Sequence, residues 1–136
     1  MADQIRRVDY YYVEVPDKPG EGVRILGALK EAGVNLLSFT AFPSSKGKTQ
    51  IDLVAADGEA LTRAAKNAGL TLSARKQAFF VQGADRAGAA AEVLRKLSNA
   101  GINIRAANGA AAQGGFGMIV WVSQGDFANA AKALGA

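Results

Sequence analysis

The chain has 136 residues, of which 49% are hydrophobic and 21% charged, with a formal net charge of +4. No stretch approaches the ~20 apolar residues of a membrane-spanning helix, and the first residues lack the apolar core of a secretory signal, so we expect a cytoplasmic protein. The absence of cysteine and histidine removes thiolate chemistry, the commonest general base and the usual transition-metal ligands. We therefore expect no enzyme activity, no metal and no cofactor.

The positive charge does not by itself indicate a nucleic-acid-binding protein. Such proteins gather basic residues in a patch or stripe. The 16 Lys and Arg residues of this chain are scattered along its length. We attribute them to solubility and do not expect nucleic acid or a membrane among the partners.

The first half of the chain alternates strand and helix signals. β-branched and aromatic residues at 9–15 predict a strand, and Asp-Lys-Pro-Gly at 17–20 predicts a turn. Apolar residues at helical spacing then predict a helix. The residues expected on its buried face are Val23, Leu26, Leu29 and Ala32. The remaining elements expected are strands at 34–42 and 49–56, a helix that opens at 57–59, and a fourth strand at 70–74.

The second half repeats the first. The stretch Asp17–Asn35 returns 68 positions later as Asp85–Asn103, with Asp-x-x-Gly at its start and Ala-Gly near its end. With the same offset, Ile119 aligns with Ile51 and Trp121 with Leu53, so Met118 and Val120 are expected on the sheet face away from the helices. A Gly/Ala-rich loop is expected at 108–115, after a strand at 102–107. The chain ends where the first half has its fourth strand.

This order predicts an α+β fold made of two ferredoxin-like βαββαβ units in tandem, with helices on one face of an antiparallel sheet. The expected units are residues 1–76 and residues 77–136, and the second unit lacks its last strand. An open sheet edge is a pairing site. The missing strand would come from the first copy, by exchange, or from a second chain. We expect the two sheets to associate and the chain to form a homodimer.

The doubled motif resembles the ACT domain, a family of small regulatory modules that bind amino acids. DKPG at 17–20 and AGVNL at 32–36 are similar to the turn and second-strand motifs of that family, and 85–88 and 100–104 repeat them with Ala87 in place of proline. The resemblance covers residues 8–136. It implies a stand-alone sensor, or a subunit acting on an enzyme or a transcription factor. It also implies a ligand between two units, where the turn of one faces the second strand of the other.

The chemistry of these motifs suits a free amino acid. A helix N-terminus attracts the carboxylate, glycine permits close approach, aspartate accepts hydrogen bonds from the ammonium, and asparagine offers both a donor and an acceptor. The expected ligand-binding residues are Asp17, Lys18, Pro19, Gly20, Asn35, Leu36, Asp85, Arg86, Ala87, Gly88, Asn103 and Ile104. Each also has a purely structural interpretation, as a helix cap, a turn residue or a loop tie.

Two other interpretations stay open. Gly115–Trp121 resembles the aromatic third strand of RNA-recognition motifs, which makes Phe79, Phe116 and Trp121 candidates for stacking on bases. Against this, Gly114 stands where a basic residue is expected, and the third strand of the first half has no aromatic residue. The other alternative is a structural pairing module without a ligand. The sequence identifies neither the amino acid nor the regulated partner.

Overall fold

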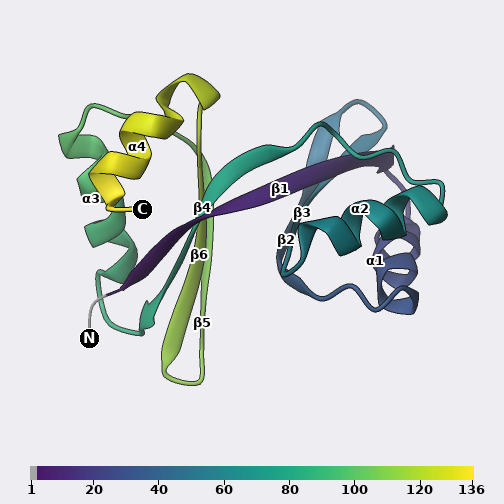
Figure 1. Ribbon diagram of the computed structural model, residues 1–136, viewed down its shortest axis with the longest axis horizontal. Helices are drawn as coiled ribbons and strands as arrows, with labels where there is room; N and C mark the ends of the chain where they lie inside the picture. Colours follow the sequence, from purple (N-terminus) through teal and green to yellow (C-terminus); the bar gives the residue numbers. More distant parts are fainter. Residues whose placement is uncertain (1–2) are drawn as a thin grey trace. The chain divides into compact units, whose positions relative to one another are not determined.

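The computed structural model describes residues 3–136, which form six strands and four α-helices (Figure 1). The elements are β1 (Gln4–Pro16), α1 (Glu21–Glu31), β2 (Leu36–Ser45), β3 (Lys48–Ala55), α2 (Gly58–Asn67), β4 (Lys76–Ala84), α3 (Ala89–Asn99), β5 (Ile104–Ala112), β6 (Gly115–Val122) and α4 (Phe127–Leu134), with a short 3₁₀ turn at Gln124–Asp126. None of the helices among residues 3–136 is long and apolar enough to cross a membrane.

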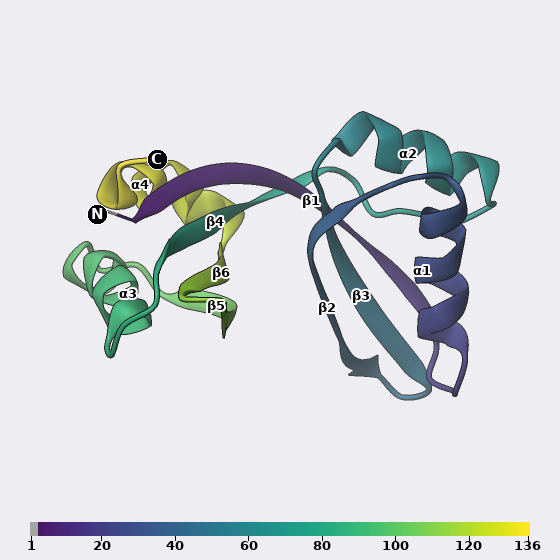
Figure 2. The same cartoon turned by 90° about the horizontal axis from the view of Figure 1, so that it is seen from below.

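Strands that share hydrogen bonds follow the order β2-β3-β1-β4-β6-β5. In the first half, β3 pairs antiparallel with β1 and β2; in the second half, β6 pairs antiparallel with β4 and β5. Both helices of each half lie on one side of that half's strands (Figure 2). The predicted α+β fold of ferredoxin-like units is therefore confirmed.

Strand β1 supplies the strand that the second unit was expected to lack. It has 13 residues and starts well before the predicted strand at 9–15. The stretch up to Val8 forms one compact unit with Gln77–Ala136, whereas Asp9–Lys76 forms the other. β1 and β4 are neighbours in the sheet. The N-terminal stretch of the chain itself thus completes the second unit, and the first unit begins at Asp9 rather than at residue 1.

The fourth strand predicted at 70–74 does not form. These residues run beside β1 and share two hydrogen bonds with it: Ser73 N–H donates to the Tyr12 carbonyl (2.8 Å), and Tyr12 N–H donates to Ser73 Oγ (3.0 Å). The serine hydroxyl takes the place of a backbone acceptor. A side-chain bond of this kind does not propagate into a ladder, so the segment stays irregular.

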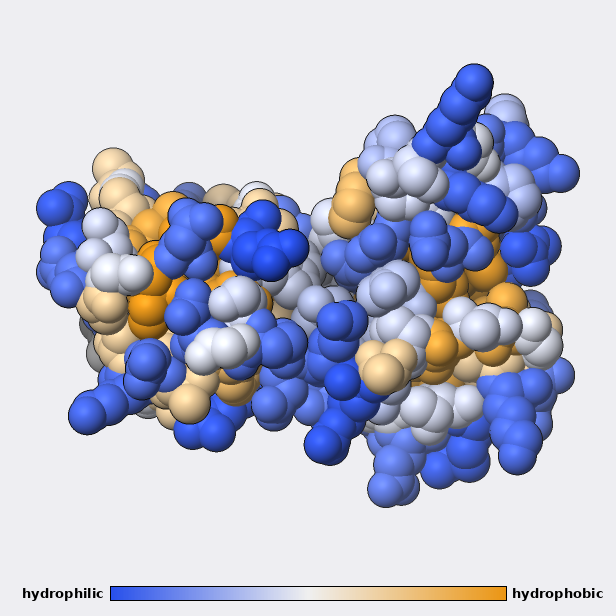
Figure 3. All heavy atoms as spheres, turned by 90° about the horizontal axis from the view of Figure 1, so that it is seen from above, coloured by the Kyte–Doolittle hydropathy of each residue, from blue (hydrophilic) through white to orange (hydrophobic). Residues whose placement is uncertain are grey.

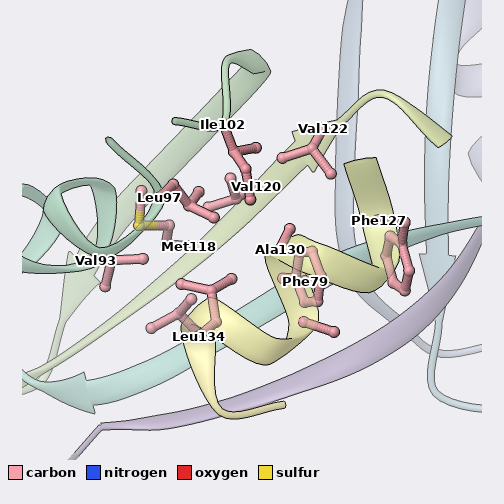
Figure 4. Packing of buried hydrophobic residues seen from close by; sticks show 12 residues of the cluster. Phe79, Val93, Leu97, Ile102, Met118, Val120, Val122, Phe127, Ala130 and Leu134 are labelled. Atoms are coloured by element: carbon pink, nitrogen blue, oxygen red, sulfur yellow. The ribbon is translucent and has the colours of Figure 1, made fainter. Parts of the chain in front are cut away.

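Each unit has its own apolar core between its sheet and its helices. The core of the second unit comes from β4, α3, β6 and α4 (Figure 4), and Phe79 stacks on Phe127 with ring centroids 4.5 Å apart. Its buried residues are Phe79, Val81, Val93, Leu97, Ile102, Met118, Val120, Val122, Phe127, Ala130, Ala131 and Leu134. Those of the first unit are Val13, Val15, Ile25, Leu29, Ile51, Leu53, Leu61 and Ala64.

The prediction that Met118 and Val120 face away from the helices is wrong. Val120 pairs with Phe79 as Leu53 pairs with Tyr11, so the equivalence between the third strands is shifted by one residue. The cause is an irregularity in the register around Ser44, a residue that the second hairpin does without. A one-residue bulge moves all following side chains to the opposite face. Met118 and Val120 therefore lie in the core.

The buried face of α1 also differs from the prediction. Val23 is 77% exposed and Ala32 is exposed, while Ile25 and Leu29 are buried. The four residues from Ile25 to Leu29 keep both on one helix face, whereas the six residues from Val23 to Leu29 turn Val23 to another face. In α3 the matching buried pair is Val93 and Leu97. The internal repeat thus identifies the buried positions better than either helix alone.

Strand β5 extends through most of the predicted loop at 108–115. It ends at Ala112, and the turn consists of Gln113 (φ 52°) and Gly114 (φ 79°). Two consecutive positive φ angles are typical of a tight two-residue hairpin. Alanine and glycine have weak strand propensity, but pairing with β6 overrides it.

The surface drawn in Figure 3 is largely hydrophilic, with hydrophobic residues emerging in separate patches. The large hydrophobic residues that are most exposed in the described chain all belong to the first unit. They are Val23, Phe39 and Phe42.

Candidate functional site

The two Asp-x-x-Gly turns have the same backbone structure. Asp17 N–H donates to the Gly47 carbonyl (3.0 Å), and Asp85 N–H donates to the Gly114 carbonyl (2.9 Å). Each turn is thereby tied to the tip of the following hairpin. Gly20 (φ 95°) and Gly88 (φ 83°) precede the first residue of α1 and α3 in a left-handed conformation that favours glycine.

The start of α3 lacks the side-chain cap that α2 has. In α2, Asp57 Oδ1 accepts hydrogen bonds from the backbone N–H groups of Glu59 (3.0 Å) and Ala60 (3.2 Å). Gly88 has no side chain that can do this for α3. The first backbone N–H groups of a helix have no acceptor within the helix. Those of Ala90 and Ala91 are therefore suited to an anion.

A cleft of about 460 Å³ lies between this turn, the start of α3 and the middle of β5. Its lining residues all belong to the second unit. They are Asp85, Arg86, Gly88, Ala89, Ala90, Ala91, Ala107, Asn108, Gly109, Ala110, Ala111, Phe116 and Met118. The cleft thus brings together three of the predicted ligand-binding residues, Asp85, Arg86 and Gly88. Ala87 lies in the same exposed turn but outside the lining.

Small side chains on β5 explain why this cleft exists. Ala107 pairs with Val120, and Gly109 pairs with Met118, so both face the helices together with those core residues. The next position on this face is Ala111. The equivalent positions of β2 in the first unit, from the same registers, are Phe39, Ala41 and Pro43. Ala107, which stands where the first unit has Phe39, lines the cleft together with residues at the start of α3.

Arg86 is the cation of the cleft. Its two terminal nitrogens donate to both Asp3 carboxylate oxygens (3.0 and 3.1 Å), to the Ala84 carbonyl (3.1 Å) and to the Glu92 carboxylate, and its guanidinium lies 5.9 Å from the centre of the Phe116 ring. Hydrogen bonding to Asp3, and then to Glu92, raises the pKa of Arg86. The same hydrogen bond from Arg86 lowers the pKa of Asp3 below its usual value.

The predicted residues of the first turn are exposed and engaged differently. Asp17 Oδ1 accepts a hydrogen bond from Thr49 Oγ1 (3.1 Å). Lys18 N–H donates to the carbonyl of Pro16 (3.0 Å). Pro19 and Gly20 are exposed at the turn.

The predicted second-strand residues lie away from the turns of their own units. Asn35 and Leu36 line a separate cleft of about 480 Å³ with residues of α1 and with Phe39, and the Asn35 carbonyl accepts from Ala56 N–H (3.0 Å). Asn103 is exposed and Ile104 packs against the second core; neither lines the cleft of Asp85. Within neither unit does the described structure bring a turn and its asparagine together.

Sequence reasoning missed several residues that shape the cleft. The helix-facing residues of β5 carry a signal, a run of Ala and Gly where the first half has bulkier residues, but we assigned most of them to a loop. Asp3 gives no signal in the sequence, because its contact with Arg86 depends on the N-terminal stretch joining the second unit.

The three aromatic residues considered for RNA stacking do not form an exposed platform. Phe79 is fully buried and stacked on Phe127, and Trp121 is 6% exposed. Phe116 is half-buried, packs against the core and lies under Arg86. Bases stack on aromatic rings that are accessible from solvent. This arrangement disfavours the RNA-binding alternative.

No protein-family model and no curated protein sequence matches this chain. Solved structures match it over nearly its full length. Protein BT0572 from Bacteroides thetaiotaomicron is 16% identical with a TM-score of 0.78, covering 94% of this chain and 88% of that one. The ligand-free regulatory subunit of aspartate kinase from Thermus thermophilus is 16% identical with a TM-score of 0.64, covering 98% and 94%. The corresponding subunit from Thermus flavus is 18% identical with a TM-score of 0.59 and the same coverage.

These similarities establish the fold. The chain shares the tandem ACT architecture of aspartate kinase regulatory subunits, as its repeated motif predicted.

Proposed function

We propose that this chain is a non-catalytic regulatory module that binds an amino acid in the cleft of its second unit. One observation carries the proposal: the cleft joins Asp85, Arg86 and Gly88 of the repeated turn to the uncapped start of α3. A volume of about 460 Å³ lies within the usual range of small-molecule pockets, about 300–1,000 Å³. Binding is coupled to self-association or to the activity of a partner.

Each part of an amino acid has a counterpart in the cleft. The carboxylate is bound by the N–H groups at the start of α3 and by the Arg86 guanidinium. The exposed Asp85 carboxylate accepts from the ammonium. Phe116 and Met118 offer apolar contacts to the ligand's side chain. A screen of the common amino acids identifies the ligand.

We further propose that two copies associate along their open sheet edges. β5, which borders the cleft, and β2 are the outer strands of the hydrogen-bonded order. Open edges favour strand pairing. Such pairing would complete the cleft with residues of a second unit. The exposed residues expected to take part are Asp17, Lys18, Pro19, Gly20, Asn35, Ala87 and Asn103, with Leu36 and Ile104 beside them. Light scattering should give about twice 14.1 kDa; a monomer at every concentration, with and without amino acids, would refute this.

The regulated partner we favour is an enzyme, with a transcription factor as the alternative, and we propose that the module works in the cytoplasm. Support comes from the shared fold with proteins described as regulatory subunits of aspartate kinase. A regulatory role also agrees with a sequence that lacks histidine and cysteine.

Thermal-shift measurements with each common amino acid at millimolar concentration test the proposal. A ligand at 100 times its dissociation constant stabilises the native state by about 2.7 kcal/mol, or roughly 10 °C for a chain of this size. N-acetylated and methyl-esterified forms of the same amino acid are the controls and should give no shift. The absence of a shift with every amino acid would contradict the proposal.

A further inference from the structure

The guanidinium of Arg86 already holds a carboxylate. Asp3 pairs with it through two parallel hydrogen bonds of 3.0 and 3.1 Å. The Asp3 side chain is only 11% exposed in this pair, and that of Arg86 is 35% exposed. Two-point pairing of this kind is how arginine recognises carboxylates in general, including those of small ligands.

The glycine at position 83 makes room for this pair. A Cβ atom placed there would overlap the Asp3 carboxylate and would lie 2.9 Å from Phe116 Cε1. Gly83 does not have the left-handed backbone conformation that favours glycine. The close approach of Asp3 and Phe116 therefore accounts for the absence of a side chain.

Arg86 has no free pair of terminal N–H groups for a second carboxylate. Each of its two terminal nitrogens carries two hydrogens. One nitrogen donates to Asp3 and the Ala84 carbonyl, and the other donates to Asp3 and Glu92. A carboxylate that binds Arg86 in two-point fashion must therefore take the place of an existing partner. Asp3 is the partner whose geometry it would reproduce.

Resting on the proposed function, we propose that Arg86 is the carboxylate-binding residue of the cleft and that Asp3 is a tethered competitor that the ligand displaces. Asp3 immediately precedes β1 and lies outside the strand, and residues outside paired strands open locally at lower cost than core strands. The ligand's apparent affinity equals its intrinsic affinity for free Arg86 multiplied by the fraction of time in which Asp3 leaves Arg86 free. Only ligands that outbind it occupy the cleft.

Displacement of Asp3 also has a structural consequence. Asp3 fastens the start of β1 to the turn of the second unit, while Arg7 fastens β1 to the last carbonyl of the chain, at Ala136 (3.2 Å). A ligand that removes the first contact leaves the second in place. Ligand binding is thereby linked to the freedom of Asp3, and not to loss of the strand.

The test is an acetate titration of the full chain, followed by the ¹⁵N resonances of the Arg86 side chain. Acetate carries a carboxylate without an ammonium, so it probes this contact alone. Asp3→Asn should tighten acetate binding about tenfold. Asp9→Asn removes a charge from the same strand, next to Arg75 in the first unit, and should leave acetate binding unchanged. Equal acetate affinity in wild type and Asp3→Asn would overturn the proposal.

A second variant tests the same point without changing any charge. Gly83→Ala should push the Asp3 carboxylate off Arg86 and tighten acetate binding in the same direction as Asp3→Asn. Gly125→Ala, where an added Cβ meets no atom within 4 Å, is its control. Arg86→Gln should abolish the acetate response in every background. A response that survives in Arg86→Gln would overturn the assignment of the site.

These outcomes are separable from those of the amino-acid screen. If amino acids raise the melting temperature but Asp3→Asn does not tighten acetate binding, the tethered competitor is refuted and the module's function stands. If no amino acid gives a shift but acetate displaces Asp3 from Arg86, the contact is established and the ligand is a carboxylate of another class.

Discussion

The two units share one scaffold, and within residues 3–136 the cleft that lies at a turn is that of the second unit. Both turns are tied to a hairpin tip by the same backbone hydrogen bond. The first turn is followed by a pair between Glu21 and Arg24 on α1, whereas the second carries Arg86 toward Asp3 and Phe116. On the edge strand, Phe39 of the first unit corresponds to Ala107 of the second. A repeated motif thus duplicates the scaffold, while the edge strands of the two copies differ in the size of their side chains.

The cores of the units differ at one matched position, and this predicts the largest effect. Phe79 is fully buried and stacked on Phe127, while its counterpart Tyr11 is half-buried. Phe79→Ala should lower the free energy of unfolding by about 3–5 kcal/mol. Tyr11→Ala should cost less than half of that. Urea unfolding, followed by the fluorescence of the single tryptophan Trp121, measures the effect on the second unit.

Equal costs for the two substitutions would show that burial at this position does not distinguish the units. A similar result would follow if the first unit depended on Tyr11 as strongly as the second depends on Phe79. The tryptophan signal should report the destabilisation caused by Phe79→Ala more directly than that caused by Tyr11→Ala, because Trp121 belongs to the second unit.

Ala107→Phe turns the second unit into a copy of the first at the edge strand. The added ring should take up part of the cleft and weaken amino-acid binding at least tenfold, because Ala107 lines the cleft. Calorimetric titration with the amino acid found by thermal shift measures this. Ala106→Phe places the same ring on the opposite face of β5 and should leave the affinity unchanged. Full binding by Ala107→Phe would place the ligand elsewhere.

The helix starts offer a smaller test of the comparison. Asp57 caps α2 through two backbone N–H groups, whereas α3 has no such cap. Asp57→Ala should lower stability by about 1 kcal/mol, as is usual for loss of an N-cap. It should not affect ligand binding, since α2 belongs to the first unit. A change in affinity for the amino acid would contradict the assignment of the cleft to the second unit.

Two aspartates with shifted pKa values predict the smallest effects on stability. The pH dependence of these effects is opposite in the two units. Arg86 lowers the pKa of Asp3, so this carboxylate stabilises the fold above its unfolded pKa and loses that contribution as the pH falls through its folded pKa. Burial raises the pKa of Asp52, despite a hydrogen bond from Gln50, so stability is lost as the pH rises from the ordinary pKa of aspartate through the folded pKa.

Unfolding measured between pH 3 and pH 7 separates the two. At pH 7, Asp3→Asn should be less stable than wild type and Asp52→Asn more stable. The Asp52→Asn difference should shrink as the pH falls toward the ordinary pKa of aspartate, near 3.9, whereas the Asp3→Asn difference should persist to that pH and shrink only below it. Differences that stay constant with pH would show that neither carboxylate acts through its charge.

The sequence predicted the fold because the repeat and the turn chemistry are local signals. The 68-residue echo, the glycines before α1 and α3 and the helix-opening Asp57 all act through nearby backbone. The residues of the third strands that face the helices were harder to predict from the sequence. They depend on a register irregularity near Ser44 that the second hairpin lacks. The residue types around Ser44 do not reveal it.

The candidate site was predictable only in part, because local geometry places some of its residues and long-range pairing places the others. Asp85, Arg86 and Gly88 follow from the motif, since the turn places them together by local geometry. Ala107 and Asp3 reach the site through strand register and through pairing of the chain's first strand with the second unit. Such long-range pairings are set by tertiary packing and override the weak propensity of an Ala/Gly segment.

The most direct test is to map the amino acid found by thermal shift onto the chain by amide NMR. Binding in the second unit should move the resonances of residues 85–91 and 107–111 and leave those of residues 17–23 and 39–43 in place. Shifts centred on 17–23 and 39–43 instead would contradict the account, because they would put the ligand in the first unit, where the edge strand has Phe39 in place of Ala107.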